Sequence, residues 1–188
     1  MNTPRLLLHT CCAPCVAYVY RLLQHDYDIT AYFYNPNIAP YGEYRIRRDE
    51  LIRFGQNESF QVIEGDRDHK RWTSLVKEYR FLGERSPRCH ECYRVRLEQS
   101  FKYAIQNNYH VVATVLSISP HKDADMINQI GSELQEKYNV PFLEADFKKK
   151  DGFKKSVELS REYNFYRQNY CGCIYSKLER DKNSVYSR

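Results

Sequence analysis

The chain has 188 residues and seven cysteines, and its 29 Lys and Arg outnumber its 24 Asp and Glu to give a formal net charge of +5. This length suits a single domain, residues 1–188, with a hydrophobic core that needs no disulfide staples. No stretch approaches the roughly 18 apolar residues of a membrane span, and residues 1–8 lack the apolar length of a signal peptide. We therefore expect a cytoplasmic protein that is not attached to a membrane.

Short apolar runs alternate with helical patterns along the chain. Strands are expected at residues 5–9, 29–34, 60–63, 111–116 and 141–144. Helices are expected between and after them, at residues 15–25, 43–55, 72–79, 92–107, 123–138 and 154–163. The alternation predicts an α/β fold, a single Rossmann-like domain whose parallel sheet of about five strands is flanked by helices. A helical C-terminal extension, from about residue 151 to 188, carries Cys171 and Cys173.

The cysteines fall into three clusters, CCAPC at 11–15, CHEC at 89–92 and CGC at 171–173. Cysteines used only for packing would be scattered among the apolar stretches. In a cytoplasmic protein, clustered cysteines are typically metal ligands or catalytic thiols, and an odd number argues against a complete disulfide framework. The clusters therefore indicate metal or redox chemistry.

The first cluster follows the first expected strand, and residues 117–122 follow the strand at 111–116. Ligands of parallel α/β sheets bind outside the carboxyl ends of the strands, so we expect the active site at this edge. The helix that starts there favours thiolates at Cys11, Cys12 and Cys15. Cys89 and Cys92 precede the next helix with a spacing that zinc and iron–sulfur sites share, so a structural zinc on four thiols remains an alternative.

The third cluster separates Cys171 from Cys173 by Gly172 alone. Two such cysteines can form only a small, strained disulfide ring, and strained disulfides are easily reduced. The pair indicates either a two-electron redox element or ligands to a second metal. Since four thiols suffice for a cubane cluster, the remaining three favour a redox enzyme over a plain zinc fold.

Several other residues are candidates for function. His121 and Lys122 lie at the expected active edge, where they could donate a proton or hold a phosphate, although Asp123 could simply cap the next helix. His9 is a candidate partner of the cysteines. The basic runs at residues 45–48 and 148–155 could bind RNA phosphates or could simply be solvated surface. The tyrosines at 32, 34, 41 and 44 could stack on bases or could pack against the core.

Four motifs occur in order along the chain: HTCCAPC at 9–15, RCHECYRVRL at 88–97, SISPHK at 117–122 and YCGC at 170–173. Together they resemble the cobalamin-independent epoxyqueuosine reductases, the QueH family, from about residue 5 to about residue 178. The resemblance implies reduction of epoxyqueuosine to queuosine at the wobble position of tRNA, the last step of queuosine biosynthesis, with an external electron donor.

The resemblance also implies the cofactors and their ligands. It places a [4Fe–4S] cluster on Cys11, Cys12, Cys89 and Cys92, and a redox-active disulfide between Cys171 and Cys173. An additional mononuclear iron is associated with the family, and its candidate ligands are Cys15, Cys171, Cys173 or a carboxylate. His121 is the candidate proton donor.

Three other classes of protein would need different residues. A tRNA-thiolating ATP pyrophosphatase needs a Ser-Gly-Gly phosphate loop after the first strand, where this chain has HTCC at 9–12. A thiol–disulfide oxidoreductase would need only one C-x-x-C pair, and a zinc-stabilised RNA-binding module would lack catalysis. Both would be colourless, whereas an iron–sulfur protein is brown.

Overall fold

The computed structural model describes residues 3–185, with side chains up to residue 182, and has a parallel sheet at its centre. Four strands form this sheet in the order β3-β2-β1-β4: β1 (Arg5–His9), β2 (Asp28–Phe33), β3 (Gln61–Glu64) and β4 (Val111–Thr114). Each strand runs parallel to its neighbours. The predicted α/β class with a parallel sheet is confirmed.

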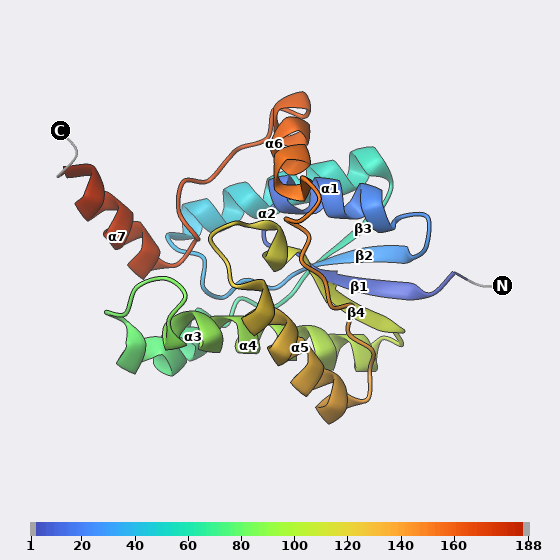
Figure 1. Ribbon diagram of the computed structural model, residues 1–188, viewed down its shortest axis with the longest axis horizontal. Helices are drawn as coiled ribbons and strands as arrows, with labels where there is room; N and C mark the ends of the chain where they lie inside the picture. Colours follow the sequence, from blue (N-terminus) through green and yellow to red (C-terminus); the bar gives the residue numbers. More distant parts are fainter. Residues whose placement is uncertain (1–2, 186–188) are drawn as a thin grey trace.

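Helices cover both faces of the sheet (Figure 1). One face carries α1 (Ala13–Leu23), α2 (Tyr41–Glu58) and α6 (Gly152–Glu162). The other carries α4 (Pro87–Gln106) and α5 (Ala124–Tyr138), and α3 (His69–Val76) packs against α4 beyond the strands. Short 3-10 turns follow α3 and β4, at Lys77–Tyr79 and Val115–Ile118. Because both faces are covered, Leu6, Leu7 and Leu8 of β1 are all fully buried.

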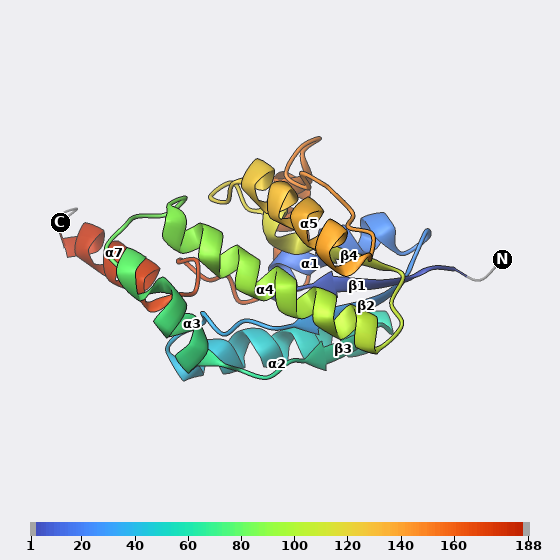
Figure 2. The same cartoon turned by 90° about the horizontal axis from the view of Figure 1, so that it is seen from below.

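The last helix, α7 (Ile174–Val185), lies at the end of the molecule opposite the N-terminus, beside α3 (Figures 1 and 2). Arg88 of α4 makes an ion pair with Glu179 of α7, at 2.9 Å. The ring of Tyr175 packs near that of Trp72 of α3, with centroids 6.0 Å apart. These contacts hold the C-terminal cysteines against the second layer of helices. No helix among residues 3–185 combines the length and apolar character needed to cross a membrane.

The predicted fifth strand is wrong. Residues 141–144 make only an isolated bridge, between Val112 and Phe142. Pro141 has no N–H to donate to a ladder. At this bridge the Leu143 N–H donates to the Val112 carbonyl oxygen and the Val112 N–H donates to that of Pro141, both at 2.9 Å. The Phe142 N–H donates instead to the side chain of Gln135 in α5, at 2.7 Å. The segment therefore pairs with β4 at one residue and does not form a fifth strand.

Helix α4 begins one turn earlier than predicted. Ser86 is extended and Pro87 occupies the first turn, where a missing N–H costs nothing. Cys89 and Cys92 therefore lie inside the helix and not ahead of it, three residues apart on one face. Asp123 caps α5 by accepting a hydrogen bond from the Met126 N–H, at 3.1 Å, which confirms its structural role.

Candidate functional site

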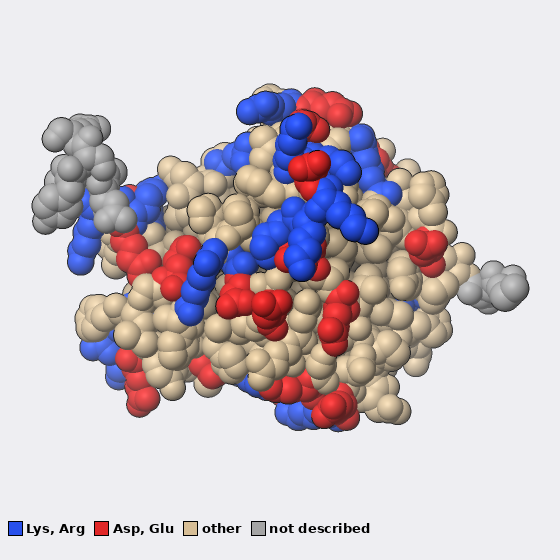
Figure 3. All heavy atoms as spheres, in the orientation of Figure 1, with Lys and Arg blue, Asp and Glu red and all other residues tan. Residues whose placement is uncertain are grey.

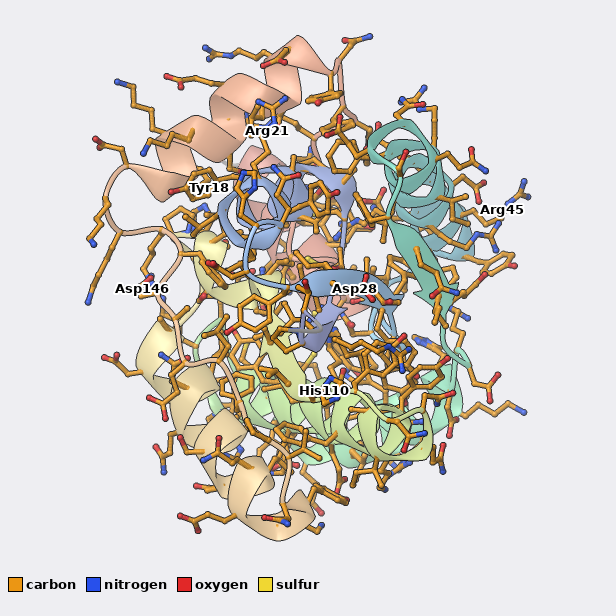
Figure 4. All side chains as sticks on the ribbon, turned by 90° about the vertical axis from the view of Figure 1, so that its right-hand side faces the viewer. Tyr18, Arg21, Asp28, Arg45, His110 and Asp146 are labelled. Atoms are coloured by element: carbon orange, nitrogen blue, oxygen red, sulfur yellow. The ribbon has the colours of Figure 1, made fainter. Side chains whose placement is uncertain are left out.

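A cavity of about 620 Å³ opens at the carboxyl edge of the sheet. Thiols from all three cysteine clusters line it, namely Cys11, Cys15, Cys89 and Cys171. The residues after β4, from Ile118 to Lys122, form another part of its wall, together with residues of α6 and of the segment 167–171. Figure 4 looks from the other end of the molecule, where Asp28 and His110 lie at the amino ends of β2 and β4. The cavity is therefore at the edge where the sequence placed the active site.

The first cluster gathers three sulfur atoms at the turn from β1 into α1. The Sγ atoms of Cys11, Cys12 and Cys15 lie within 4.8 Å of one another. Cys12 Sγ is 2.8 Å from Cys15 Sγ and 3.7 Å from Cys11 Sγ, and the Gln168 side-chain amide donates to it at 3.2 Å. Three thiols this close could bind one metal ion, so Cys15 joins the other two cysteines of its cluster.

The other four cysteines come from α4 and the turn before α7. Cys92 and Cys173 share a buried cluster with Trp72 and Val76. Cys171 lines the cavity, while Cys173 is buried and its Sγ accepts a hydrogen bond from the Ser176 N–H at 3.3 Å. Both Cys171 and Cys173 are free thiols, so the expected disulfide between them is absent from this structure.

Glycine is required between these two cysteines. Gly172 has a φ of +128°, which side-chain-bearing residues rarely adopt. A Cβ at this position would lie 3.1 Å from Arg47 Nη1 and 3.2 Å from Ile38 Cγ1. The close approach to Arg47 fixes the turn against α2.

Arg47 holds this turn from the interior. It is 1% exposed, pairs with Glu43 at 2.7 Å, and donates to the carbonyl oxygens of Cys171 at 3.2 Å and Tyr170 at 3.3 Å. The idea that all of residues 45–48 contact RNA is therefore wrong, because every fourth helical position faces the core. Arg45 points outward from α2 (Figure 4).

Replacing Arg47 with methionine is expected to lower the free energy of unfolding by about 3–5 kcal/mol, because it leaves Glu43 buried without its partner. Urea unfolding of the metal-free protein, followed by circular dichroism, measures this. The control is Arg48→Met on the same helix, whose ion pairs with Asp49 and Glu64 are partly exposed and contribute about 0–1 kcal/mol. Equal effects of the two substitutions would contradict the interior role of Arg47.

Two cationic side chains face the thiols without a carboxylate partner among residues 3–182. Arg96 is 1% exposed and donates to Asn35 Oδ1 at 2.6 Å and to His9 Nε2 at 3.3 Å, both neutral groups. Burial opposes the charge on Lys122, but thiolates at Cys171 and Cys11 outweigh it and raise the pKa of Lys122. Arg96 and Lys122 therefore supply positive charge that would compensate negative charge on nearby sulfur.

The thiols differ in acidity. Hydrogen bonds from Cys12 and Cys15 hold the pKa of Cys11 well below its ordinary value. Burial raises the pKa of Cys12 to about 12 and that of Cys92 to about 11, and the pKa of Cys15 is also raised by its hydrogen bonds to its neighbours. Without a metal, Cys11 is therefore the most acidic thiol of the first cluster, because burial and the neighbouring sulfur atoms oppose a second charge beside it. Metal binding would have to displace these protons.

The family model described as "Epoxyqueuosine reductase QueH" matches residues 6–179. The chain belongs to the QueH family. A QueH protein of Histophilus somni is 39% identical over 180 residues, which cover 95% of this chain and 74% of the relative. One of Thermotoga maritima is 38% identical over 187 residues, covering 97% of this chain and 96% of the relative. Both carry the name epoxyqueuosine reductase, which denotes an oxidoreductase.

A solved structure supports the fold of this QueH chain. The predicted subunit of a tRNA methyltransferase from Methanocaldococcus jannaschii aligns with a TM-score of 0.50 and 15% identity. The alignment covers 81% of this chain and 76% of that one. At this identity the likeness concerns the α/β fold alone.

The site of this QueH chain fits a metal cofactor. Thiolates are soft ligands that prefer iron–sulfur clusters, zinc and copper(I) among metals. The first cluster offers three sulfur atoms in contact range, and Arg96 and Lys122 would compensate the negative charge of a thiolate-bound centre. The donor set and its surroundings are thus consistent with a bound metal.

The histidine candidates separate in the structure. His9 is fully buried, and its Nδ1 lies 2.8 Å from Thr114 Oγ1. Burial lowers the pKa of His9 to about 3, so it is a neutral partner that holds Arg96 near the thiols. His121 is exposed at the cavity wall, whereas its neighbour Lys122 faces the sulfur atoms. The motif at residues 117–122 contains both residues, but nothing in the sequence indicates which of them is exposed.

The tyrosine candidates for base stacking are mostly interior residues of this QueH fold. Tyr32, Tyr34 and Tyr44 are at most 3% exposed, so their prediction as base-stacking residues is wrong. Tyr41 is 55% exposed and is the one of the four that a base could reach. The alternation of side chains along β2 does not expose any of its tyrosines, because helices cover both faces of the sheet.

Proposed function

We propose that the chain reduces epoxyqueuosine to queuosine at the wobble position of tRNA, the last step of queuosine biosynthesis, and that this depends on a [4Fe–4S] cluster. The observation that carries the proposal is the cavity into which all three cysteine clusters open. A single space lined by Cys11, Cys89 and Cys171 suits a reaction in which a substrate meets a sulfur-ligated centre. The names of the relatives support the choice of substrate.

The proposed cluster ligands are Cys11, Cys12, Cys89 and Cys92, which come from the turn before α1 and the first turns of α4. Cys15 and Cys171 line the same cavity and are the proposed ligands of an additional iron. When bound, the iron–sulfur cluster would supply electrons. The protein supplies the sulfur ligands, the positive charges around them and a substrate cavity.

The reaction itself sets what the residues must do. Converting an epoxide to an alkene removes one oxygen atom as water and consumes two electrons and two protons. The electrons come from an external reductant, and we propose that Lys122 holds positive charge beside the departing oxygen at the cavity wall. His121, exposed on the same wall, is the proposed route for protons from solvent.

A basic surface beside the cavity is proposed to hold the tRNA. Figure 3 shows Lys and Arg side chains gathered over α6 and the turn before it. Lys150, Lys154 and Lys155 are exposed there, while Phe153 and Ser156 of the same segment line the cavity. Lysines at this position would neutralise phosphates on either side of a nucleotide that enters the cavity. We place the enzyme in the cytoplasm with its tRNA.

The test is an assay of protein purified and reconstituted with iron and sulfide under anaerobic conditions. We expect a brown protein that converts epoxyqueuosine in tRNA to queuosine when a strong one-electron reductant is present. Iron and sulfide are quantified in the same preparation. A colourless protein that contains zinc but no iron, and that is inactive, would contradict the proposal. That result would favour a zinc-stabilised RNA-binding module.

A further inference from the structure

Trp72 is the single tryptophan of the chain, and its side chain has an unexplained polar atom. It lies in α3 and is 1% exposed. Its indole Nε1 is buried and has no hydrogen-bond partner among the described residues. A buried donor without an acceptor costs about 1–3 kcal/mol, so its persistence needs a physical reason.

The surroundings of Trp72 are rich in sulfur. The indole packs in one buried cluster with Cys92, Cys173 and Val76, and Tyr175 packs against this cluster. Its ring also lies near that of His69, with centroids 5.8 Å apart and planes 22° apart. Cys92 belongs to α4, which packs against α3, so its sulfur is an acceptor in the same buried cluster as the indole N–H. The contact nevertheless lacks the geometry of a formed hydrogen bond.

Arg96 approaches the same sulfur from a second direction. It follows Cys92 by four residues on α4, so the two side chains share a helix face. Its guanidinium is buried and has only neutral partners besides the cysteines, Asn35 and His9. A guanidinium without a carboxylate partner and an indole N–H without an acceptor therefore both lie beside Cys92. A neutral thiol is a weak acceptor that satisfies neither, whereas a thiolate accepts strongly.

We propose that Trp72 is a positioning residue whose indole N–H donates a hydrogen bond to the Cys92 sulfur when that sulfur binds a metal as a thiolate. The inference rests on the metal centre of the proposed function and adds a partner outside its ligand set. Such outer partners orient ligands, and their loss typically weakens metal affinity about 10–100-fold. Hydrogen bonds to ligand sulfur also set the reduction potential of iron–sulfur centres.

The test uses zinc as the metal, because it is diamagnetic and needs no sulfide or reductant. With one tryptophan, protein carrying ¹⁵N-labelled indole has a single indole N–H resonance that can be followed during titration of the metal-free full chain. We expect this proton to move downfield and exchange more slowly with solvent as zinc binds. The change should disappear in Cys92→Ala.

Two variants remove the N–H. Trp72→Phe keeps an aromatic ring, and replacing Trp72 with 3-benzothienylalanine keeps the shape of the indole while a sulfur atom replaces the N–H. Both are expected to bind zinc about 10-fold more weakly than the wild type. The control is Tyr175→Phe, an aromatic change in the same cluster, which should bind zinc as the wild type does.

Three results would overturn the proposal: no zinc uptake by the wild type, an unmoved indole resonance with zinc bound, or unchanged affinity in the benzothienyl variant. None of these measurements involves iron, tRNA or turnover. A protein that shows the indole shift but carries no iron after reconstitution would refute the proposed function and leave the hydrogen bond standing. Conversely, an active iron protein with an unmoved indole would refute only the hydrogen bond.

Discussion

Replacing Cys89 with alanine is expected to remove the iron–sulfur cluster and to reduce epoxyqueuosine reduction by more than about 100-fold. Loss of an outer partner of a metal ligand already costs about 10–100-fold in affinity or activity, and loss of a ligand costs more. Cys89 lies in the first turn of α4 and opens into the cavity, so no other residue of that turn replaces its sulfur. Iron and sulfide content, visible absorption and turnover on modified tRNA are measured together.

The matched control is His90→Ala, one residue further along the helix and outside the cavity lining. We expect it to keep the iron content and activity of the wild type. Full activity of the Cys89→Ala protein without iron would refute the cluster as the source of electrons. Loss of iron in both variants would instead indicate a damaged helix start.

Replacing Lys122 with methionine is expected to reduce turnover by about 10²–10⁴-fold, the range typical of removing a group that stabilises charge or transfers a proton in the transition state. Lys122 faces Cys171 and Cys11 across the cavity, and its raised pKa keeps it charged at neutral pH. The positive charge beside the departing oxygen would be lost. The measurement is single-turnover kinetics at saturating tRNA, with iron content determined in parallel.

His121→Gln serves as the comparison, because His121 lies on the same wall but is exposed and can be replaced by solvent as a proton source. We expect a loss of less than about 10-fold from this substitution. A Lys122→Met protein that keeps its turnover rate but needs more tRNA would assign Lys122 to phosphate binding. A larger loss from His121→Gln than from Lys122→Met would reverse the two proposed roles.

Local patterns in the sequence predict most of the elements and the edge that carries the site. Strand β1 is a run of apolar residues, and α1 begins beside Pro14, so the turn that holds Cys11 and Cys12 follows from short-range preferences. The two exceptions also have local causes. Pro87 permits α4 to begin a turn earlier, and Pro141 prevents the last apolar run from pairing as a full strand.

Burial of charged and polar side chains is decided by contacts between distant segments. The run at residues 45–48 looks like a basic surface, yet Arg47 is interior because residues 170–172 fold back across α2. Tyr32 and Tyr34 are interior because helices cover both faces of the sheet. Neither burial is encoded within a few residues of the side chain concerned.

By itself the sequence determined the family, the α/β class, the three cysteine clusters and the edge of the sheet where the first cluster and residues 117–122 lie. Only the tertiary structure decided which distant segments meet: Cys92 packs with Cys173 and Trp72, and Cys11, Cys89 and Cys171 open into one cavity. The physical reason is the separation along the chain between the residues that interact. Periodicity and helix starts depend on neighbours within a few residues, whereas the surroundings of each thiol depend on segments up to about 160 residues away that meet only when the sheet and its helices pack.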